Sequence, residues 1–160
     1  MTQNQGRREF LGKVVIGGSV VAATGAGATL ASAKESGAAR RVVPARPGAP
    51  FSRAVLLDNL IYVAGVVGRK PNSPELASKE FRPQCRQVME NLKASVEASG
   101  STMARVLKCN CFLTDVSDFP VMNELFRSYF PSDPPARSTV VVKELVVPGA
   151  KIEIDCVAGL

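Results

Sequence analysis

Residues 134–142 read Pro-Pro-Ala-Arg-Ser-Thr-Val-Val-Val and place one arginine at the start of an apolar, β-branched strand. The prolines restrict the backbone, so the segment should enter the strand stiff and extended. Side chains alternate along a strand, so Arg137, Thr139 and Val141 share one face. Ser138, Val140 and Val142 share the other. We expect the second face to pack on the core. Arg137 is then either a solvated strand-end arginine or a fixed anchor for a small acid, since its guanidinium matches a carboxylate with two donors.

Hydrophobic periods predict an α/β (α+β) domain around this strand. Alternation over about 52–57 and 60–66 predicts a hairpin that turns at Asp58-Asn59. Apolar residues spaced by three or four predict a helix over about 83–99 that ends at Gly100. A strand over 106–114, a second helix N-capped by Asp118 and a last strand over 151–158 complete the pattern. Helices on one face of a mixed sheet are the economical layout.

Over about residues 42–158 the chain resembles the RidA (YjgF-type) family of reactive imine and enamine deaminases. The matching segments keep the family's order and spacing and are residues 54–65, 86–93, 112–119, 122–124, 135–140 and 151–155. The resemblance implies a chorismate-mutase-like fold, with a mixed six-stranded sheet and two helices on one face. It also implies a homotrimer with sites in clefts between subunits, which agrees with a sheet face that no third helix can cover.

The resemblance also implies roles for individual residues. Arg137 is expected to clamp the substrate carboxylate, and Glu153 is the acid near the reacting carbon. The remaining substrate-binding positions are Phe51, Gly65, Asn123 and Thr139. From the residues alone, a plainer interpretation of each stays open: Glu153 as an exposed strand carboxylate, and Asn123 as an ordinary polar residue of a helix.

The implied reaction is hydrolytic deamination of 2-aminoacrylate-like 2-imino acids to 2-oxo acids and ammonia, without a metal or organic cofactor. The chain contains no histidine, so any acid-base chemistry must use other groups. Three departures from the family pattern make the cleft more apolar: Phe51 replaces a common tyrosine, Ala64 a serine, and Val66-Val67-Gly68 a Gln-(Ile or Val)-Pro run. They suit a bulkier imino acid, an aminomuconate-like compound or a weakened enzyme.

Two other functions compete with the deaminase. The first is a non-catalytic periplasmic small-molecule binder or holdase-type stress protein on the same trimer. The second is a ribonuclease or translation inhibitor, an activity attached to some relatives, which export from the cytoplasm disfavours. Residues 1–33 carry a net charge of +2, so the rest of the chain keeps +6 − 2 = +4, which is a mild excess. The sequence has no arginine-rich strip with interleaved aromatics, so general nucleic-acid binding is not expected.

The four cysteines, Cys85, Cys109, Cys111 and Cys156, do not have zinc-site spacing. In an exported chain they would suggest disulfides, but twin-arginine export moves proteins that have already folded in a reducing cytoplasm. We therefore expect small, buried, reduced core residues, with disulfides as the alternative.

The N-terminus differs in character from the rest of the chain. Arg7-Arg8-Glu9-Phe10-Leu11 precedes a weakly apolar run rich in Gly, Ala and Val that ends at Ala31-Ser32-Ala33. This pattern is typical of a twin-arginine signal peptide over residues 1–33, cleaved after Ala33 or retained as an anchor. A linker over 34–41 and the RidA-like domain over 42–160 would follow. The predicted location is the periplasm, with the twin-arginine translocation machinery as a partner during export.

Overall fold

The computed structural model describes residues 39–160 of the chain. The predicted signal peptide, its cleavage site and most of the predicted linker lie outside the described residues. Within the described part, no helix combines the length and the apolar character needed to cross a membrane.

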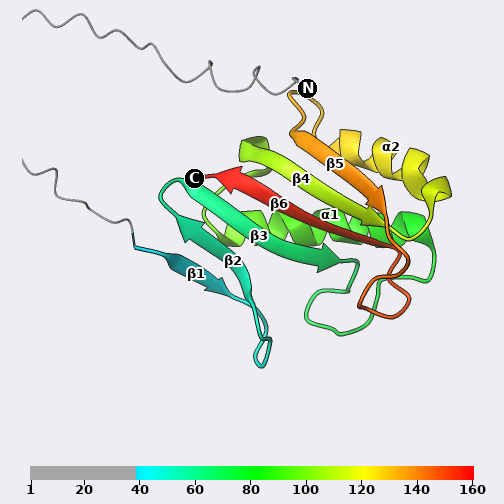
Figure 1. Cartoon of the computed structure of the whole chain (residues 1–160), viewed down its shortest axis with the longest axis horizontal. Coiled ribbons are helices and arrows are strands. Elements are labelled where there is room, and N and C mark those ends of the chain that lie inside the picture. The colour runs from blue at the N-terminus through cyan, green and yellow to red at the C-terminus, as the bar shows by residue number, and fades with distance from the viewer. Residues whose placement is uncertain (1–38) are drawn as a thin grey trace, which may run out of the picture. The chain divides into compact units, whose positions relative to one another are not determined.

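The domain is a six-stranded mixed sheet with two helices on one face (Figure 1). The strands are β1 (Arg41–Pro44), β2 (Ser52–Leu57), β3 (Leu60–Val67), β4 (Val106–Leu113), β5 (Ala136–Val141) and β6 (Ile152–Gly159). The helices are α1 (Phe81–Ala98) and α2 (Phe119–Tyr129), with short 3₁₀ turns η1 (Met103–Arg105) and η2 (Val116–Asp118). The strand order is β1-β2-β3-β6-β4-β5, and only β4 and β5 run parallel. The predicted fold class is confirmed.

The β2–β3 hairpin forms where the sequence predicts it. Leu57 pairs with Leu60, so Asp58 and Asn59 are the two turn residues. Asp58 has φ of 52°, the left-handed conformation that aspartate tolerates in such turns. β1 pairs with β2 from Arg41, the last residue assigned to the linker, so the sheet begins at that residue.

The core lies between the helices and one face of the sheet. In β6, Ile152, Ile154, Cys156 and Ala158 are buried toward the helices, while the alternate residues face the other way. α1 covers this face with apolar side chains that recur every three or four residues, Cys85, Val88, Met89, Leu92 and Val96.

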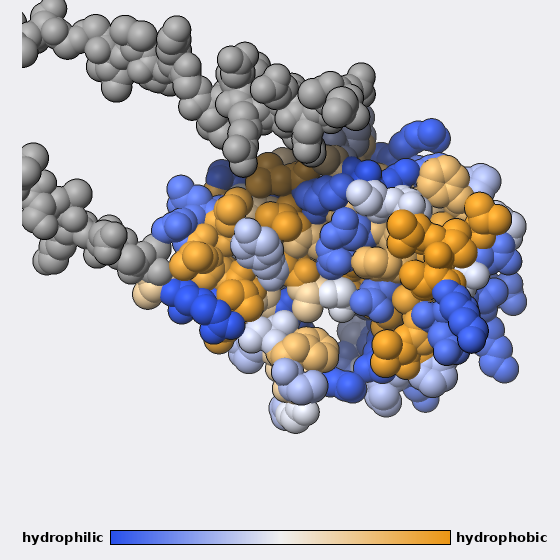
Figure 2. All heavy atoms as spheres, in the orientation of Figure 1, coloured by the Kyte–Doolittle hydropathy of each residue, from blue (hydrophilic) through white to orange (hydrophobic). Residues whose placement is uncertain are grey.

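The opposite face of the sheet carries no helix, and we call it the open face. Figure 2 shows apolar side chains gathered on it over β2 and β3. Leu57, Tyr62 and Val140 are all about half exposed. An apolar sheet face of this kind is typical of a surface that another chain covers.

A buried amide connects α1 to two loops. The Gln84 side chain is fully buried, and its Nε2 donates to the carbonyl oxygens of Ser78 and Gly149, both at 2.9 Å. Its Oε1 accepts from the backbone N–H of Lys151, also at 2.9 Å. All three hydrogen bonds are needed because an unpaired buried amide is costly. The loop before β6 is therefore fixed to α1.

The start of α2 differs from the prediction. Asp118 is the N-cap residue, but its backbone is helical and its side chain makes no capping hydrogen bond. Asp115, three residues earlier, accepts from the backbone N–H of Ser117 at 2.8 Å and caps η2 instead. Sequence reasoning missed the extra 3₁₀ turn, which moves the capping carboxylate upstream.

The two faces of β5 point in the opposite directions to those that the sequence predicted. Ser138 and Val140 lie on the open face and are exposed, whereas Arg137 and Thr139 lie on the helix side and are half buried. Arg137 pairs with Cys109 and Thr139 with Cys111, and both cysteines are buried in the core. Alternation separates two faces but cannot say which one the helices cover.

All four cysteines are free and buried, as predicted. Burial raises the pKa of Cys85 and of Cys156 to about 12 and that of Cys111 to about 11. The thiols therefore stay protonated at neutral pH and act as small apolar core residues.

Gly68 provides a test of the packing between the end of β3 and α1. A Cβ at this position would lie 2.6 Å from the backbone oxygen of Gln84 and 3.0 Å from its Cα. Backbone atoms cannot move aside as a side-chain tip can, so Gly68→Ala should destabilise the fold by about 1 to 3 kcal/mol in chemical denaturation. Gly159→Ala is the matched control, because its Cβ would meet only ordinary contacts at 3.6 Å or more. Equal stability of the two variants would contradict this packing.

Candidate functional site

Arg137 is held against α2 by a hydrogen bond and two aromatic rings. Its Nη2 donates to Oδ1 of Asn123 at 2.6 Å. The guanidinium carbon lies 4.6 Å from the centre of the Phe126 ring and 5.8 Å from that of Phe119. These distances lie within the range of cation–π attraction. The guanidinium is thus oriented, although the side chain is only partly buried.

The arrangement leaves part of the Arg137 fork available to a ligand. Asn123 accepts from one of the five N–H groups, and Arg137 forms no ion pair within the described part of the chain. A carboxylate could take two of the remaining donors in parallel. Of the two sequence interpretations, the structure therefore favours the fixed anchor.

Phe126 is a contact of Arg137 that the sequence analysis did not identify. Phe126 follows Asn123 by three residues, so both lie on the same face of α2 and reach Arg137 together. The spacing of an amide and an aromatic was the available signal. It carries no information on which strand lies opposite until the fold is known.

Glu153 lies on the open face of β6, between Val67 of β3 and Phe112 of β4. It is half buried, and this burial, with a smaller contribution from Asp155, raises the pKa of its carboxyl above the ordinary value. Asp155 is itself fixed, because its Oδ1 accepts from Nδ2 of Asn110 at 2.8 Å. A carboxyl with a raised pKa exchanges protons closer to neutral pH.

Gly65 lies directly against the Glu153 carboxylate. A Cβ at Gly65 would overlap Oε1 of Glu153, so any other residue would displace that carboxylate. The pairing of β3 with β6 is irregular between Val63 and Val66, and this bulge contains Gly65. Gly65 and Glu153 therefore form one unit on the open face.

The structure divides the predicted site residues into two groups. Arg137, Asn123 and Thr139 belong to the helix side of β5, whereas Glu153 and Gly65 belong to the open face. Arg137 and Glu153 therefore lie on opposite faces of one sheet. A single chain does not bring the two together.

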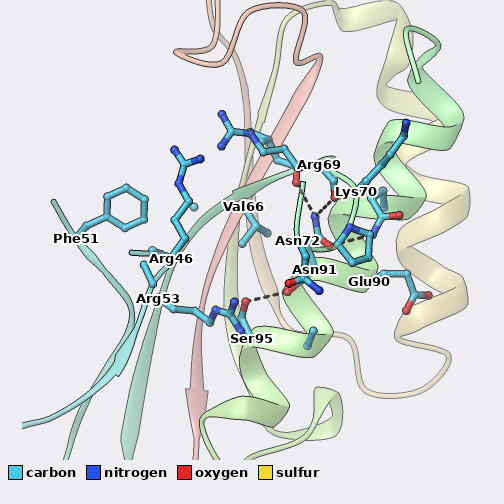
Figure 3. Close-up of a pocket in the computed structure, with 17 residues that line it drawn as sticks. Arg46, Phe51, Arg53, Val66, Arg69, Lys70, Asn72, Glu90, Asn91 and Ser95 are labelled. Carbon is cyan, nitrogen blue, oxygen red and sulfur yellow. Dashed lines mark hydrogen bonds between the residues drawn. The ribbon is translucent and has the colours of Figure 1, made fainter. Parts of the chain in front are cut away.

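Phe51 lies just before β2, on the side of Gly65, and is 57% exposed. It lines an open pocket of about 550 Å³ between β2, the end of β3 and α1, together with Gly65 and several cationic side chains (Figure 3). Arg137 and Glu153 do not line this pocket. Within the described residues, no group of three or more Cys, Asp or Glu side chains is placed to hold a metal ion.

Comparison with known proteins finds one matching family and several similar proteins that are named as deaminases. The model of the family described as "Endoribonuclease L-PSP" matches residues 43–160. "Reactive Intermediate Deaminase A, chloroplastic" from Arabidopsis thaliana is 37% identical, over 81% of this chain and 68% of its own length. A "2-iminobutanoate/2-iminopropanoate deaminase" from Dermatophagoides farinae is 38% identical, over 70% of this chain and 87% of its own length.

Solved structures agree with the fold. The crystal structure of RidA from the Antarctic bacterium Psychrobacter sp. superimposes with a TM-score of 0.67 at 39% identity, over 74% of this chain and 94% of that one. The family match, the identities and the shared six-stranded sheet with two helices all point the same way. The chain therefore belongs to the RidA/YjgF/L-PSP family.

Proposed function

We propose that the protein hydrolyses 2-imino acids, formed by tautomerisation of enamines such as 2-aminoacrylate, to 2-oxo acids and ammonia. The observation that carries this proposal is the oriented Arg137 guanidinium, held by Asn123 and Phe126 with donors left for a carboxylate. The names of the deaminase relatives support the same reaction.

Each group has a simple part in the proposed reaction. Arg137 binds the substrate carboxylate and makes the neighbouring C=N carbon easier to attack. Glu153 accepts a proton from the bound water as its oxygen adds to that carbon, and the imine nitrogen takes up one proton, which gives an amino alcohol. The hydroxyl proton then passes to the nitrogen as the C–N bond breaks, which releases ammonia and leaves the 2-oxo acid. Positioning with general acid-base help accounts for an acceleration of about 10² to 10⁴.

The proposed site needs a second copy of the chain. One chain presents Arg137 and Glu153 on opposite faces of the sheet, so a substrate that contacts both must lie between subunits. The half-exposed apolar side chains of the open face supply an interface. A homotrimer, with each cleft taking Arg137 from one copy and Glu153 from the next, satisfies both requirements.

The proposed location is the periplasm, reached by twin-arginine export directed by residues 1–33. The support is the Arg7-Arg8 pair, followed by an apolar run and a small-residue cleavage site. The substrate would then come from enzymes that oxidise amines or amino acids outside the cytoplasm, because oxidation of an α-amino group yields an imine.

Removal of the Arg137 side chain tests the deaminase directly. Imino acids generated by an amino-acid oxidase are trapped as semicarbazones, and the protein suppresses the trapping if it hydrolyses them first. Arg137→Ala should lower kcat/KM at least about 100-fold, because two charge-assisted hydrogen bonds to the carboxylate are lost. Arg127→Ala removes an exposed arginine from α2 and should keep full activity. Wild-type protein without any suppression over a broad substrate panel would favour the non-catalytic binder.

Mixing of two inactive variants tests the shared site. Arg137→Ala and Glu153→Gln are each expected to be inactive as pure trimers. After unfolding and co-refolding in equal amounts, about a quarter of wild-type activity should return, because each mixed ring of three contains one cleft with both intact residues. Wild-type protein refolded in parallel gives the reference. No recovery in mixtures that sedimentation shows to be trimeric would contradict a cleft shared in this way.

The pH dependence of the reaction tests the role of Glu153. Its carboxylate form must accept a proton from water, so kcat/KM should fall as the pH drops through the pKa of Glu153. Burial raises that pKa, so the midpoint should lie above 4.5, the ordinary value for glutamate. Asp155→Asn removes a nearby negative charge and should move the midpoint to lower pH. Asp133→Asn, an exposed change outside the site, should leave it in place, and a midpoint unmoved by Asp155→Asn would count against the assignment.

A further inference from the structure

The pocket beside Gly65 is larger than an imino acid with a methyl or ethyl side chain would fill. Its volume is about 550 Å³, within the usual range for drug-sized ligands. Gly65 lines the pocket and also lies against the Glu153 carboxylate, so the pocket adjoins the group that acts on water in the proposed reaction. In that reaction Arg137 of a second copy binds the carboxylate next to the C=N carbon. The pocket is therefore left for the side chain of the imino acid.

The lining of this pocket carries more positive than negative charge. Four cationic side chains reach it, Arg46, Arg53, Arg69 and Lys70. Lys70 is paired with Glu75 at 2.8 Å, but the three arginines form no ion pair with any residue from 39 to 160. Glu90 also lines the pocket, but its Oε1 accepts the hydroxyl hydrogen of Tyr129. The positive charge of the arginines is therefore not balanced within this range of the chain.

Two of the arginines, Arg46 and Arg69, extend toward the same side of the pocket (Figure 3). Arg69 Nε is buried and has no hydrogen-bond partner among residues 39–160. Buried donors are nearly always paired in folded proteins, so this nitrogen indicates an acceptor that comes with a ligand. Guanidinium groups bind an acid through paired donors as well as through charge. Arg46 and Arg69 together are suited to hold one acidic group.

The backbone that carries Arg69 is fixed to α1. Asn91 Nδ2 donates to the carbonyl oxygens of Val67 and Arg69, both at 2.9 Å. Asn91 is in turn oriented by Gln87, whose Nε2 donates to its Oδ1 at 2.9 Å. A guanidinium on a fixed backbone loses little freedom when it binds a ligand.

Apolar groups form another part of the lining, with Phe51, Ala64, Val66 and Ala94 among them. Methylene groups of a ligand are suited to cover this surface, because burial of apolar area is favourable. The side chain that fits the pocket thus combines a short run of methylene groups with an acidic group at its end.

We propose that the protein selects 2-imino acids whose side chain ends in a second acidic group, and that Arg46 and Arg69 bind this second acid. The inference rests on the proposed deamination and names the substrate class for it. The imine of glutamate is a simple member of the class. One of its carboxylates would lie on Arg137 of a second copy and the other at Arg46 and Arg69. A neutral imino acid lacks the second contact and should react more slowly at low concentration.

Two substrates of nearly equal size test this selectivity. The imines of glutamate and norvaline have carbon chains of the same length, and an amino-acid oxidase generates each of them in the assay. Suppression of semicarbazone formation should give a kcat/KM at least about tenfold higher for the glutamate imine, because one charge-assisted contact separates the two substrates. Equal values, or a preference for the norvaline imine, would overturn the inference and leave the deaminase proposal standing.

Arginine variants locate the second acid. Arg46→Gln and Arg69→Gln should each lower the ratio of kcat/KM for the glutamate imine to that for the norvaline imine about tenfold. Arg105→Gln removes an exposed arginine outside the pocket and should leave this ratio unchanged. A ratio that stays at the wild-type value in Arg46→Gln and Arg69→Gln, or falls equally in Arg105→Gln, would overturn the assignment. Because Arg46 is exposed in a turn, Arg46→Gln decides the result if Arg69→Gln unfolds.

Binding of the products separates the inference from the deaminase proposal. Calorimetric titration with 2-oxoglutarate and 2-oxopentanoate needs no turnover. Wild-type protein should bind 2-oxoglutarate at least about tenfold more tightly, and Arg46→Gln should remove most of that difference. If no imine is deaminated but this difference is found, the deaminase proposal fails and the selectivity for a second acid stands. Equal affinity of wild-type protein for the two oxo acids would overturn the selectivity.

Discussion

The two-residue period of β6 is the constraint on which the rest of the molecule depends. Ile152, Ile154 and Cys156 must enter the core against the helices, so Glu153 and Asp155 are forced onto the open face. A shift by one residue would bury both carboxylates and expose the apolar set. The same register that closes the core thus fixes where the acidic group lies, and Gly65 on β3 leaves room for it.

The Arg137 guanidinium is positioned by strand pairing together with contacts to a helix. Arg137 lies on β5, whose pairing with β4 places it beside Cys109 on the helix side, where α2 supplies Asn123 and Phe126. The orientation of Arg137 therefore depends on packing between a strand and a helix, whereas the position of Glu153 depends on strand pairing alone. The two groups are built on opposite faces of one sheet. This opposition is the physical reason to place the proposed reaction between subunits.

The sequence predicted the strands and helices well because their periods are strong. The turn at Asp58-Asn59, the α1 stripe and the alternation of β6 are all local patterns. The errors arose where the hydrophobic pattern carries no information about the neighbouring elements. Alternation in β5 separated Val140 from Thr139 but could not say which side the helices would cover, and the η2 turn moved the capping role from Asp118 to Asp115.

By itself the sequence determined the order of elements, the family and the candidate residues Arg137 and Glu153, because these follow from local period and motif. Only the tertiary structure decided that the two residues lie on opposite faces, that Phe126 orients the guanidinium, and that three arginines distant in sequence from Arg137 surround one pocket. Such relations join residues far apart in the chain. They arise from strand order and helix packing, which no local pattern encodes.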